Sequence, residues 1–321
     1  MSKYLLFLSL FAGFIMAPFV GEAPITLAGL FDPNSLEFRI FTELRLPRIF
    51  LAFFTGLILA LGGLIFQTLF RNALMTPYTL GVSSGAVLGA GIAIKLGLAV
   101  SFLGINTTVL FGSTGALLTV VLLLFLARFL HKAEHESLLL LGIALSFFYT
   151  SALTVLFFLS SYVETHQILR FTMGSLSIIG FDTALIAFVL ALVLFTYIYF
   201  QRFALQIISI SDEQARLKGI NTKKALYSLL GISSVAVGIM VSIVGPIGFV
   251  GLVVPHMVKK IYQKSLITLI TPIALFGGFF LLACDTLSRA ISSGSEIPIG
   301  VVTAFIGGPF FIYLILTRKK H

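Results

Sequence analysis

Ten apolar runs, separated by short polar clusters, make up most of this chain. Their approximate bounds are Tyr4–Val20, Ile49–Leu69, Tyr78–Val100, Thr107–Leu130, Leu138–Ser160, Thr183–Phe200, Leu226–Val244, Ile247–Val258, Leu266–Ala283 and Gly300–Leu316. An α-helix rises about 1.5 Å per residue, so the run Ile49–Leu69 would be about 31 Å long, close to the depth of a bilayer's hydrocarbon core. The pattern predicts an all-α polytopic membrane protein with about ten transmembrane helices, in which residues 1–321 form a single transmembrane domain.

Composition supports this prediction and removes other classes of protein. Hydrophobic residues make up 58% of the chain and charged residues 10%, with a mean hydropathy of +1.10. A soluble domain is about half apolar and a quarter charged. The net charge of +9 does not predict nucleic-acid binding, because the basic residues form short clusters between apolar runs. The single Cys284 excludes an internal disulfide.

The distribution of lysine and arginine predicts an orientation. With the C-terminus in the cytoplasm and sides alternating before it, six of the 21 basic residues fall outside and the rest inside, as the positive-inside rule requires. The six are Arg39, Arg45, Arg48, Lys95, Arg170 and Arg289. Both termini are then cytoplasmic. Residues 4–20 are expected to be a retained helix, because no clean small-x-small cleavage site precedes Glu22; a cleaved signal peptide is the alternative.

The polar stretch Arg202–Lys224 interrupts the apolar pattern on the predicted cytoplasmic side. Within a loop of about residues 204–225 we expect a short helix, with Ser211 and Gln214 as a capping box and Gly219 just beyond its end. Acidic residues suit its first turn and basic residues its last. The nine residues are Ser211, Asp212, Glu213, Gln214, Ala215, Arg216, Leu217, Lys218 and Gly219. A helix this short is marginal alone, which favours docking against a partner; a solvated loop is the alternative.

Catalytic and energising chemistry is missing from the pattern. No Gly-x-x-x-x-Gly-Lys-Ser/Thr motif occurs, so the chain encodes no nucleotide-phosphate loop. His131 and His135 have the spacing of zinc ligands but flank charged residues, so a solvated turn is the better interpretation. Asp182 and Asp285 fall near the outer ends of their runs, and no acid lies at mid-span, which disfavours an ion-coupled carrier. We therefore expect a non-enzymatic transport subunit with no resident cofactor or metal.

Glycine and proline recur inside the apolar runs. We interpret them as helix breaks, bends or close contacts along a pathway, with tight packing as the alternative at any single glycine. The candidate positions are Gly81, Gly85, Gly245, Pro246, Gly251, Pro255, Gly307, Gly308 and Pro309. The two halves of the chain also have loosely matching spans of opposite orientation, as in an inverted repeat.

Several ordered motifs resemble the FecCD-type permeases, the membrane subunits of ABC importers for iron chelates and cobalamin. They include Arg-Leu-Pro-Arg at 45–48, Gln-Thr-Leu-Phe-Arg-Asn at 67–72, Gly-Phe-Val-Gly-Leu-Val-Val-Pro-His-Met-Val at 248–258 and Glu-Ile-Pro-Ile-Gly-Val-Val-Thr at 296–303. The resemblance covers about residue 42 to the end. One departure is Ala73, where the family usually has proline.

The resemblance implies ten helices and a dimer of permease chains, expected to be identical, in the cytoplasmic membrane. Two ATP-binding subunits below would hold ATP and magnesium, and an extracytoplasmic binding protein would dock above. The helix at 211–219 would couple to the ATPase, and Arg45, Arg48 and Arg289 would meet glutamates of the binding protein; headgroup contact or pairing with Glu43 or Asp285 is the alternative. The substrate would be a siderophore, haem or cobalamin. An independent secondary carrier and a membrane-embedded enzyme are the other classes considered.

Overall fold

Helices account for nearly all of the structure, a computed structural model that describes residues 12–21, 23, 25–98, 101–102, 105–127, 129, 135–291 and 296–318. The long or medium helices are α4 (Leu46–Leu69), α5 (Val82–Lys95), α6 (Thr107–Ala127), α7 (His135–Leu159), α8 (Tyr162–Thr172), α9 (Asp182–Phe200), α12 (Thr222–Val244), α13 (Val250–Tyr262), α14 (Leu266–Ile291) and α15 (Ile299–Arg318). The short ones are η1 (Ala17–Phe19), α2 (Leu27–Leu30), α3 (Leu36–Arg39), the π-helical η2 (Ile40–Arg45), α10 (Arg202–Ile208) and α11 (Asp212–Leu217). Strands β1 (Ser101–Phe102) and β2 (Ile105–Asn106) pair antiparallel, with Ser101 opposite Asn106.

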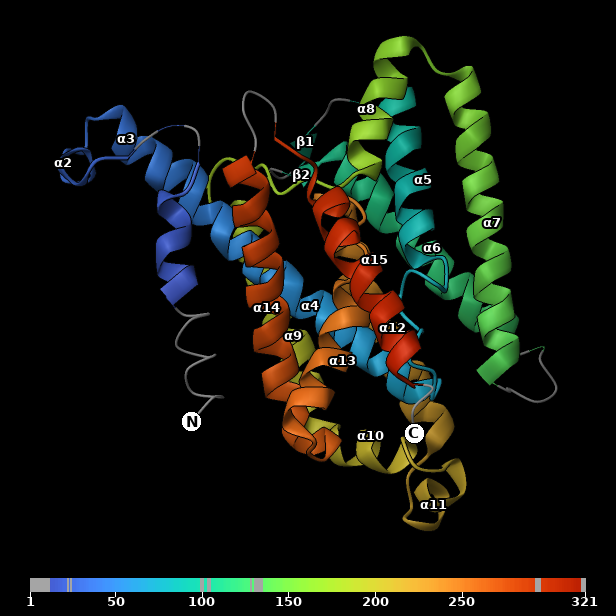
Figure 1. Cartoon of the computed structure of the whole chain (residues 1–321). Helices are drawn as coiled ribbons and strands as arrows, with labels where there is room; N and C mark the ends of the chain where they lie inside the picture. The colour runs from blue at the N-terminus through green and yellow to red at the C-terminus, as the bar shows by residue number, and fades with distance from the viewer. Residues whose placement is uncertain are drawn as a thin grey trace.

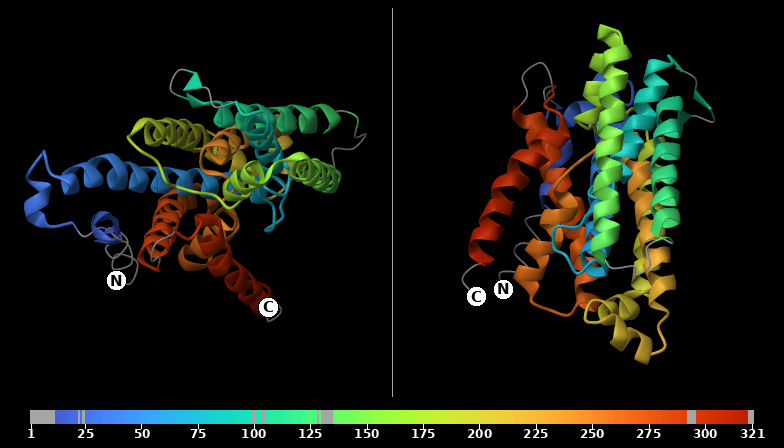
Figure 2. Two further views of the ribbon diagram at one scale, coloured as in Figure 1. Left: turned by 90° about the horizontal axis from the view of Figure 1, so that it is seen from above. Right: turned by 90° about the vertical axis from the view of Figure 1, so that its right-hand side faces the viewer.

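The helices form one bundle with two distinct ends (Figure 1). One end carries α8, the β1–β2 pair and the α2–α3 segment, and is called here the α8 end. The other carries α10 and α11 and is called the α11 end. Helix α4 crosses the bundle obliquely between the two, and Figure 2 shows it passing beneath the other helices when viewed along the bundle. Helix α4 therefore connects the two ends of the bundle.

Helix α4 is the centre of the core. Every residue from Thr55 to Leu69 is buried, because helices surround α4 on several sides. Glycines let the neighbours approach: a Cβ at Gly63 would lie 1.9 Å from the Gly251 carbonyl oxygen of α13, and one at Gly56 would lie 2.2 Å from the Gly277 oxygen of α14. In hydrocarbon, small residues at such contacts replace the hydrophobic driving force between helices.

Among the described residues, six helices are long and apolar enough to cross a membrane: Leu36–Leu69, Thr107–Leu126, Ser137–Leu159, Asp182–Phe200, Thr222–Val244 and Leu266–Ile291. The expected run Tyr78–Val100 is helical only over the 14 residues of α5, because Gly81, at φ +80°, lies in the turn that precedes it. The expected run at 247–258 becomes α13, of 13 residues. Residues 4–11 of the first expected run, 4–20, lie outside the described residues, and residues 17–19 form η1. The chain is thus a multi-spanning helical protein, in which α5 is shorter than its apolar run and α14 is longer.

At two of the places interpreted as helix breaks, bends or close contacts, the structure shows that the helix is not broken. Helix α15 runs without a break through Gly307, Gly308 and Pro309, and α13 runs through Pro255. A proline removes one backbone N–H hydrogen bond, but a helix tolerates this loss where its neighbours hold it in place. In α15 such a contact lies beside Pro309, because a Cβ at Gly307 would meet the Phe249 ring. The break at residues 245–248 between α12 and α13 is present as expected.

Candidate functional site

The α11 helix is defined at both ends by its own sequence. The Ser211 side chain accepts from the backbone N–H groups of Glu213 (3.1 Å) and Gln214 (3.3 Å). The reciprocal half of the expected capping box is not formed, because the Ser211 N–H donates to the Ile207 carbonyl at 3.3 Å instead. Gly219, at φ +78°, donates to the Arg216 carbonyl (2.9 Å), the left-handed ending that favours glycine. The helix is therefore Asp212–Leu217 with Lys218 as its C-cap.

The two faces of α11 differ in exposure. Ala215 is fully buried against the bundle, while Leu217 is 83% exposed and Ile210, just before the helix, is 58% exposed. The aliphatic side chains that project from this end are thus not needed for the chain's own core. Arg216, Gly219 and Lys223 line a shallow open cavity of about 480 Å³ beside them. Residues 210–219 thus form an exposed projection, called here the α11 knob. Its tip carries the apolar Ile210 and Leu217, and the basic Arg216 and Lys223 lie beside them.

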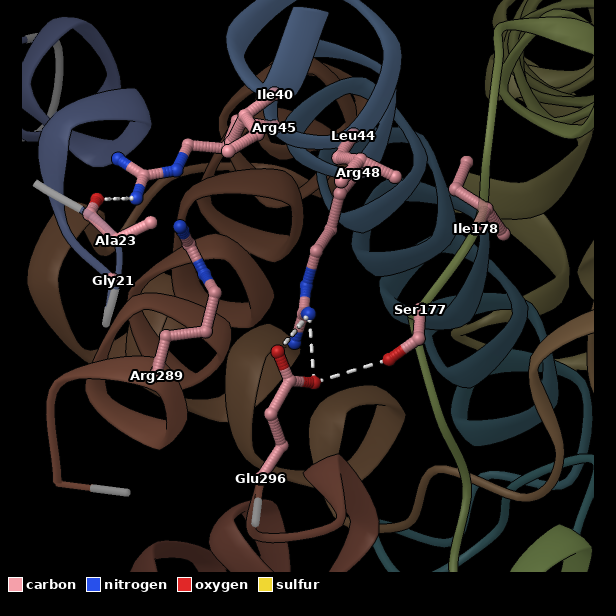
Figure 3. A pocket seen from close by; sticks show the side chains of 10 residues that line it. All are labelled: Gly21, Ala23, Ile40, Leu44, Arg45, Arg48, Ser177, Ile178, Arg289 and Glu296. Atoms are coloured by element: carbon pink, nitrogen blue, oxygen red, sulfur yellow. Dashed lines mark hydrogen bonds and ion pairs between the residues drawn. The ribbon is translucent and has the colours of Figure 1, made fainter. Parts of the chain in front are cut away.

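At the α8 end, the structure brings together the three arginines singled out in the sequence. Arg45, Arg48 and Arg289 line one cavity of about 370 Å³, with Ser177 and Glu296 (Figure 3). All three are largely buried: Arg45 is 7% exposed, Arg289 6%, and the Arg48 side chain 11%. Their side chains come from η2, α4 and α14, which are remote in sequence.

Asp285 organises two of these arginines. Its side chain is fully buried; Arg48 donates to Oδ1 from Nε (2.9 Å) and Nη2 (2.8 Å), and Arg289 donates from Nε to Oδ2 (3.1 Å). A buried carboxylate without a cation would carry a large desolvation cost, so this pairing holds α4 against α14. Of the interpretations left open for Arg48 and Arg289, the structure contains the pairing with Asp285. Glu43 pairs instead with Arg39, across 3.7 Å.

Glu296 closes the network toward the solvent. Arg48 Nη1 donates to both its oxygens (2.7 and 2.8 Å), and Ser177 Oγ donates to Oε2 (3.0 Å). Burial raises the pKa of Glu296, but these hydrogen bonds and the Arg48 charge outweigh burial and hold it below the ordinary value of 4.5. Glu296 therefore stays ionised at neutral pH. In the sequence, Glu296 stood out only as the first residue of a family motif, and Ser177 did not stand out. Asp285 and Arg289, four residues apart on one helix, have the spacing of an ion pair.

Arg45 and Arg289 also hold the N-terminal segment. Arg45 donates to the carbonyl oxygens of Pro18 (2.8 Å) and Ala23, and Arg289 donates to those of Val20 (2.6 Å) and Ala17 (3.2 Å). Guanidinium groups have five donors, so each can bind several carbonyls that no helix satisfies.

A second, larger cavity of about 740 Å³ lies on the other side of Glu296. Arg48, Ser177 and Glu296 line both cavities, and the second is also lined by Gln167 and Arg170 of α8. Helix α8 was not expected from the sequence as a separate element. It begins at a capping box of Ser161 and Glu164. Hydrogen bonds from Lys95 Nζ (2.9 Å) and from the Ser161 N–H (2.8 Å) hold the pKa of Glu164 below 4.5.

The segment after α8, which lines this cavity through Gly174 and Ser175, is bonded to the ends of two other helices. The Ser175 N–H donates to the Val244 carbonyl (2.7 Å), and the Gly300 N–H donates to the Met173 carbonyl (3.1 Å). Gly245 adopts φ +73°, and a Cβ there would lie 2.3 Å from the Phe171 carbonyl oxygen, so only glycine fits. Three helix ends, those of α8, α12 and α15, thus meet, and their backbone groups bind one another.

The remaining predicted glycines serve contacts between helices. Gly85 of α5 faces α6, where a Cβ would lie 2.0 Å from the Thr119 hydroxyl, and Gly251 of α13 faces the Leu59 carbonyl of α4. Pro246 lies in the break at 245–248. Among the described residues no cluster of three His, Cys, Asp or Glu side chains is placed to hold a metal, and His131 lies outside them.

A polytopic helical bundle with broken helices, polar cavities at one end and an ordered knob at the other defines a membrane permease. The chain belongs to the FecCD family: the model of the FecCD transport family matches residues 5–317, a longer stretch than the motifs from residue 42 onward indicate.

Curated relatives and a solved structure agree with this family assignment. The chain is 34% identical to the hemin transport system permease protein HmuU of Yersinia pestis, over 90% of this chain and 86% of the relative. It is 34% identical to the vitamin B12 import system permease protein BtuC of Pectobacterium atrosepticum, over 86% and 82% respectively. A solved structure of an ABC transporter assigned to the metal-chelate type, in an inward-facing conformation, superposes with a TM-score of 0.85 at 28% identity, covering 99% of this chain and all of that one. These relatives are named as transport subunits, in agreement with the expected absence of enzymatic activity.

Proposed function

We propose that this chain is the permease subunit of an ATP-driven ABC importer that takes up an iron chelate, either a siderophore complex or haem. The observation that carries the proposal is the α11 knob. A six-residue helix with both ends capped, a buried inner face and a leucine 83% exposed at its tip has the form of an element that inserts into a partner. Similarity to the hemin permease and to the metal-chelate type transporter supports the substrate class.

In this proposal the α11 end faces the cytoplasm and Ser211–Gly219 docks into a separate ATPase that holds ATP and magnesium. The chain itself binds neither. The orientation is supported by the basic residues of the α11 end, where Arg216 and Lys223 line the open cavity. Both termini are then cytoplasmic in the inner membrane. The ten spans are the first apolar run with α4, α5, α6, α7, α9, α12, α13, α14 and α15.

At the outer face we propose that an extracytoplasmic binding protein docks over Arg45, Arg48 and Arg289. The support is that the three guanidinium groups line one cavity. Because Asp285 and Glu296 already neutralise part of this charge, an acidic side chain of the partner would serve register and steering more than affinity. The larger cavity beside Glu296 is the proposed entrance to the pathway, and a second identical chain completes the channel.

The test is a mild-detergent pull-down of the tagged chain from its native membrane, followed by mass spectrometry. We expect an ATPase subunit and a binding protein that binds haem or a ferric siderophore. Recovery of the chain alone, together with uptake by the purified chain that follows an ion gradient and needs no ATP, would establish a secondary carrier instead.

Cobalamin is the second candidate substrate, favoured by the identity of 34% to the B12 permease. Proteoliposomes containing the complete complex distinguish the two. ATP-dependent accumulation of radiolabelled haem or ferric siderophore supports the first candidate, and accumulation of cobalamin alone supports the second.

A further inference from the structure

The segment that carries α11 is fastened to α4 by one arginine. Arg71 follows the last turn of α4; its Nε and Nη2 donate to the Ile208 carbonyl oxygen at 3.2 and 3.0 Å. The same Nη2 donates to Asp212 Oδ1 at 2.6 Å. A single side chain therefore holds the last residue of α10 and the first residue of α11.

The backbone of Arg71 is shaped for this contact. Its φ of +46° lies in the left-handed region, which residues other than glycine adopt rarely and which persists only where surrounding contacts hold it. The Phe70 N–H completes α4 by donating to the Phe66 carbonyl (3.0 Å), and the chain turns at the next residue. The Arg71 guanidinium satisfies a carbonyl of the last turn of α10, which the helix itself leaves without a partner.

A second attachment joins α10 to α14. Gln206, within α10, accepts through Oε1 the backbone N–H of Leu266 at 2.7 Å. Leu266 is the first residue of α14, where N–H groups have no partner within the helix. The short α10 helix is thus bonded to the end of α4 and to the beginning of α14, and Figure 1 shows it lying across the foot of the bundle.

The two helices that receive these attachments form one unit. In the middle, Gly56 and Gly277 place the backbones of α4 and α14 in direct contact. At the α8 end, Arg48 of α4 and the fully buried Asp285 of α14 are ion-paired at 2.8 Å. A displacement imposed at the foot of this pair therefore reaches the cavities at the other end without an intervening loop.

We propose that Arg71 and Gln206 are positioning residues that transmit movement of α11 to the α4–α14 pair. The inference rests on the proposed function, since the movement comes from a docked ATPase. Two attachments at separate points of the 206–212 segment keep it from pivoting, so a push on Leu217 moves the segment and both helices together. With either attachment removed, α11 still docks but turns on the remaining one.

The attachment itself is tested on the purified full-length permease, without an ATPase, by hydrogen exchange. We expect Arg71→Gln to speed amide exchange in residues 209–218 by about tenfold, because a charge-assisted contact and its local order are lost. Gln206→Leu should speed exchange at the start of α14, whereas Gln206→Glu keeps the acceptor and should not. The control is Lys264→Gln, a similar loss of charge at an exposed residue between α13 and α14. Unchanged exchange in Arg71→Gln and Gln206→Leu overturns the inference.

Transmission is tested on the complete complex in proteoliposomes, with radiolabelled haem or, where the recovered binding protein binds only cobalamin, with cobalamin. Arg71→Gln should still recover the ATPase in the pull-down and still hydrolyse ATP, while substrate accumulated per ATP falls about fivefold or more. Gln206→Glu should restore the ratio that Gln206→Leu loses. Normal coupling in Arg71→Gln and Gln206→Leu, despite loosened exchange, overturns the role in transmission. Absence of any ATPase with the wild-type chain contradicts the proposed function instead, and the exchange experiment then judges the attachment alone.

Discussion

Replacement of Asp285 by asparagine tests the ion network at the α8 end. The carboxylate is fully buried and binds Arg48 at 2.8 Å and Arg289 at 3.1 Å. Asparagine keeps the size of the side chain and removes the charge, so Arg289 loses the carboxylate that it binds and Arg48 keeps only Glu296. Breaking a buried ion pair on one side typically costs about 3–5 kcal/mol, because the remaining charge has no compensation.

This cost converts into a measurable shift. At about 2 °C per kcal/mol for a chain of this size, Asp285→Asn should lower the thermal midpoint by about 6–10 °C. The assay is thermal unfolding of the detergent-solubilised protein, followed by size-exclusion fluorescence. The matched control is Asp182→Asn, the same chemical change at an exposed position on the first turn of α9. Loss of a favourable helix-dipole contact there should cost about 0.3–1 kcal/mol.

Equal midpoints for the two variants would refute the reasoning, since burial and pairing would then contribute nothing at Asp285. A fall of 6 °C or more in the thermal midpoints of both variants would refute it as well. The double change Asp285→Asn with Arg289→Leu should recover part of the loss, because it also removes the charge that Asp285 compensated on α14.

Three further predictions follow from other parts of the molecule. Gly63→Ala places a Cβ 1.9 Å from the Gly251 carbonyl oxygen and should destabilise the protein by about 1–3 kcal/mol in the same thermal assay. The control Gly231→Ala, whose Cβ meets nothing within 4 Å, should stabilise it by about 0.5–1 kcal/mol. Equal effects of the two substitutions would contradict the helix contact at Gly63. Leu217→Glu should reduce recovery of the ATPase about tenfold without lowering the thermal midpoint, since this side chain is 83% exposed; full recovery would count against the knob. The pKa of Glu296 is lower in the folded chain than its ordinary 4.5, so its stabilising contribution is complete above 4.5 and is lost as pH falls through the folded value; the midpoint difference between wild type and Glu296→Gln should shrink in that acidic range and stay constant from about pH 5 to 7.

The apolar pattern predicts where the long helices lie but not where the short ones begin. Helices α9 and α12 end at Phe200 and Val244, where the sequence pattern places their ends. Helix α5 begins at Val82, four residues later than its apolar run, because Gly81 adopts a left-handed conformation that hydropathy does not detect. Helix α8 has only 11 residues and a mixed sequence, so its capping box at Ser161 was its one local signal.

The candidate sites divide in the same way between local and distant contacts. Ser211 and Gly219 define α11 through bonds to residues at most five positions away, and these could be predicted in advance. The two carboxylates that bind Arg48 are 237 and 248 residues distant, so the sequence left headgroup contact, Glu43 and Asp285 as alternatives. Packing decides among these alternatives. The contact between Gly56 and Gly277 brings α14 beside α4, so that Asp285 lies 2.8 Å from the Arg48 guanidinium. An acidic residue in an apolar helix has to find a cation, because burial of a lone charge is too costly. That rule predicts that Asp285 is paired, and only the contact between the two helices selects the arginine.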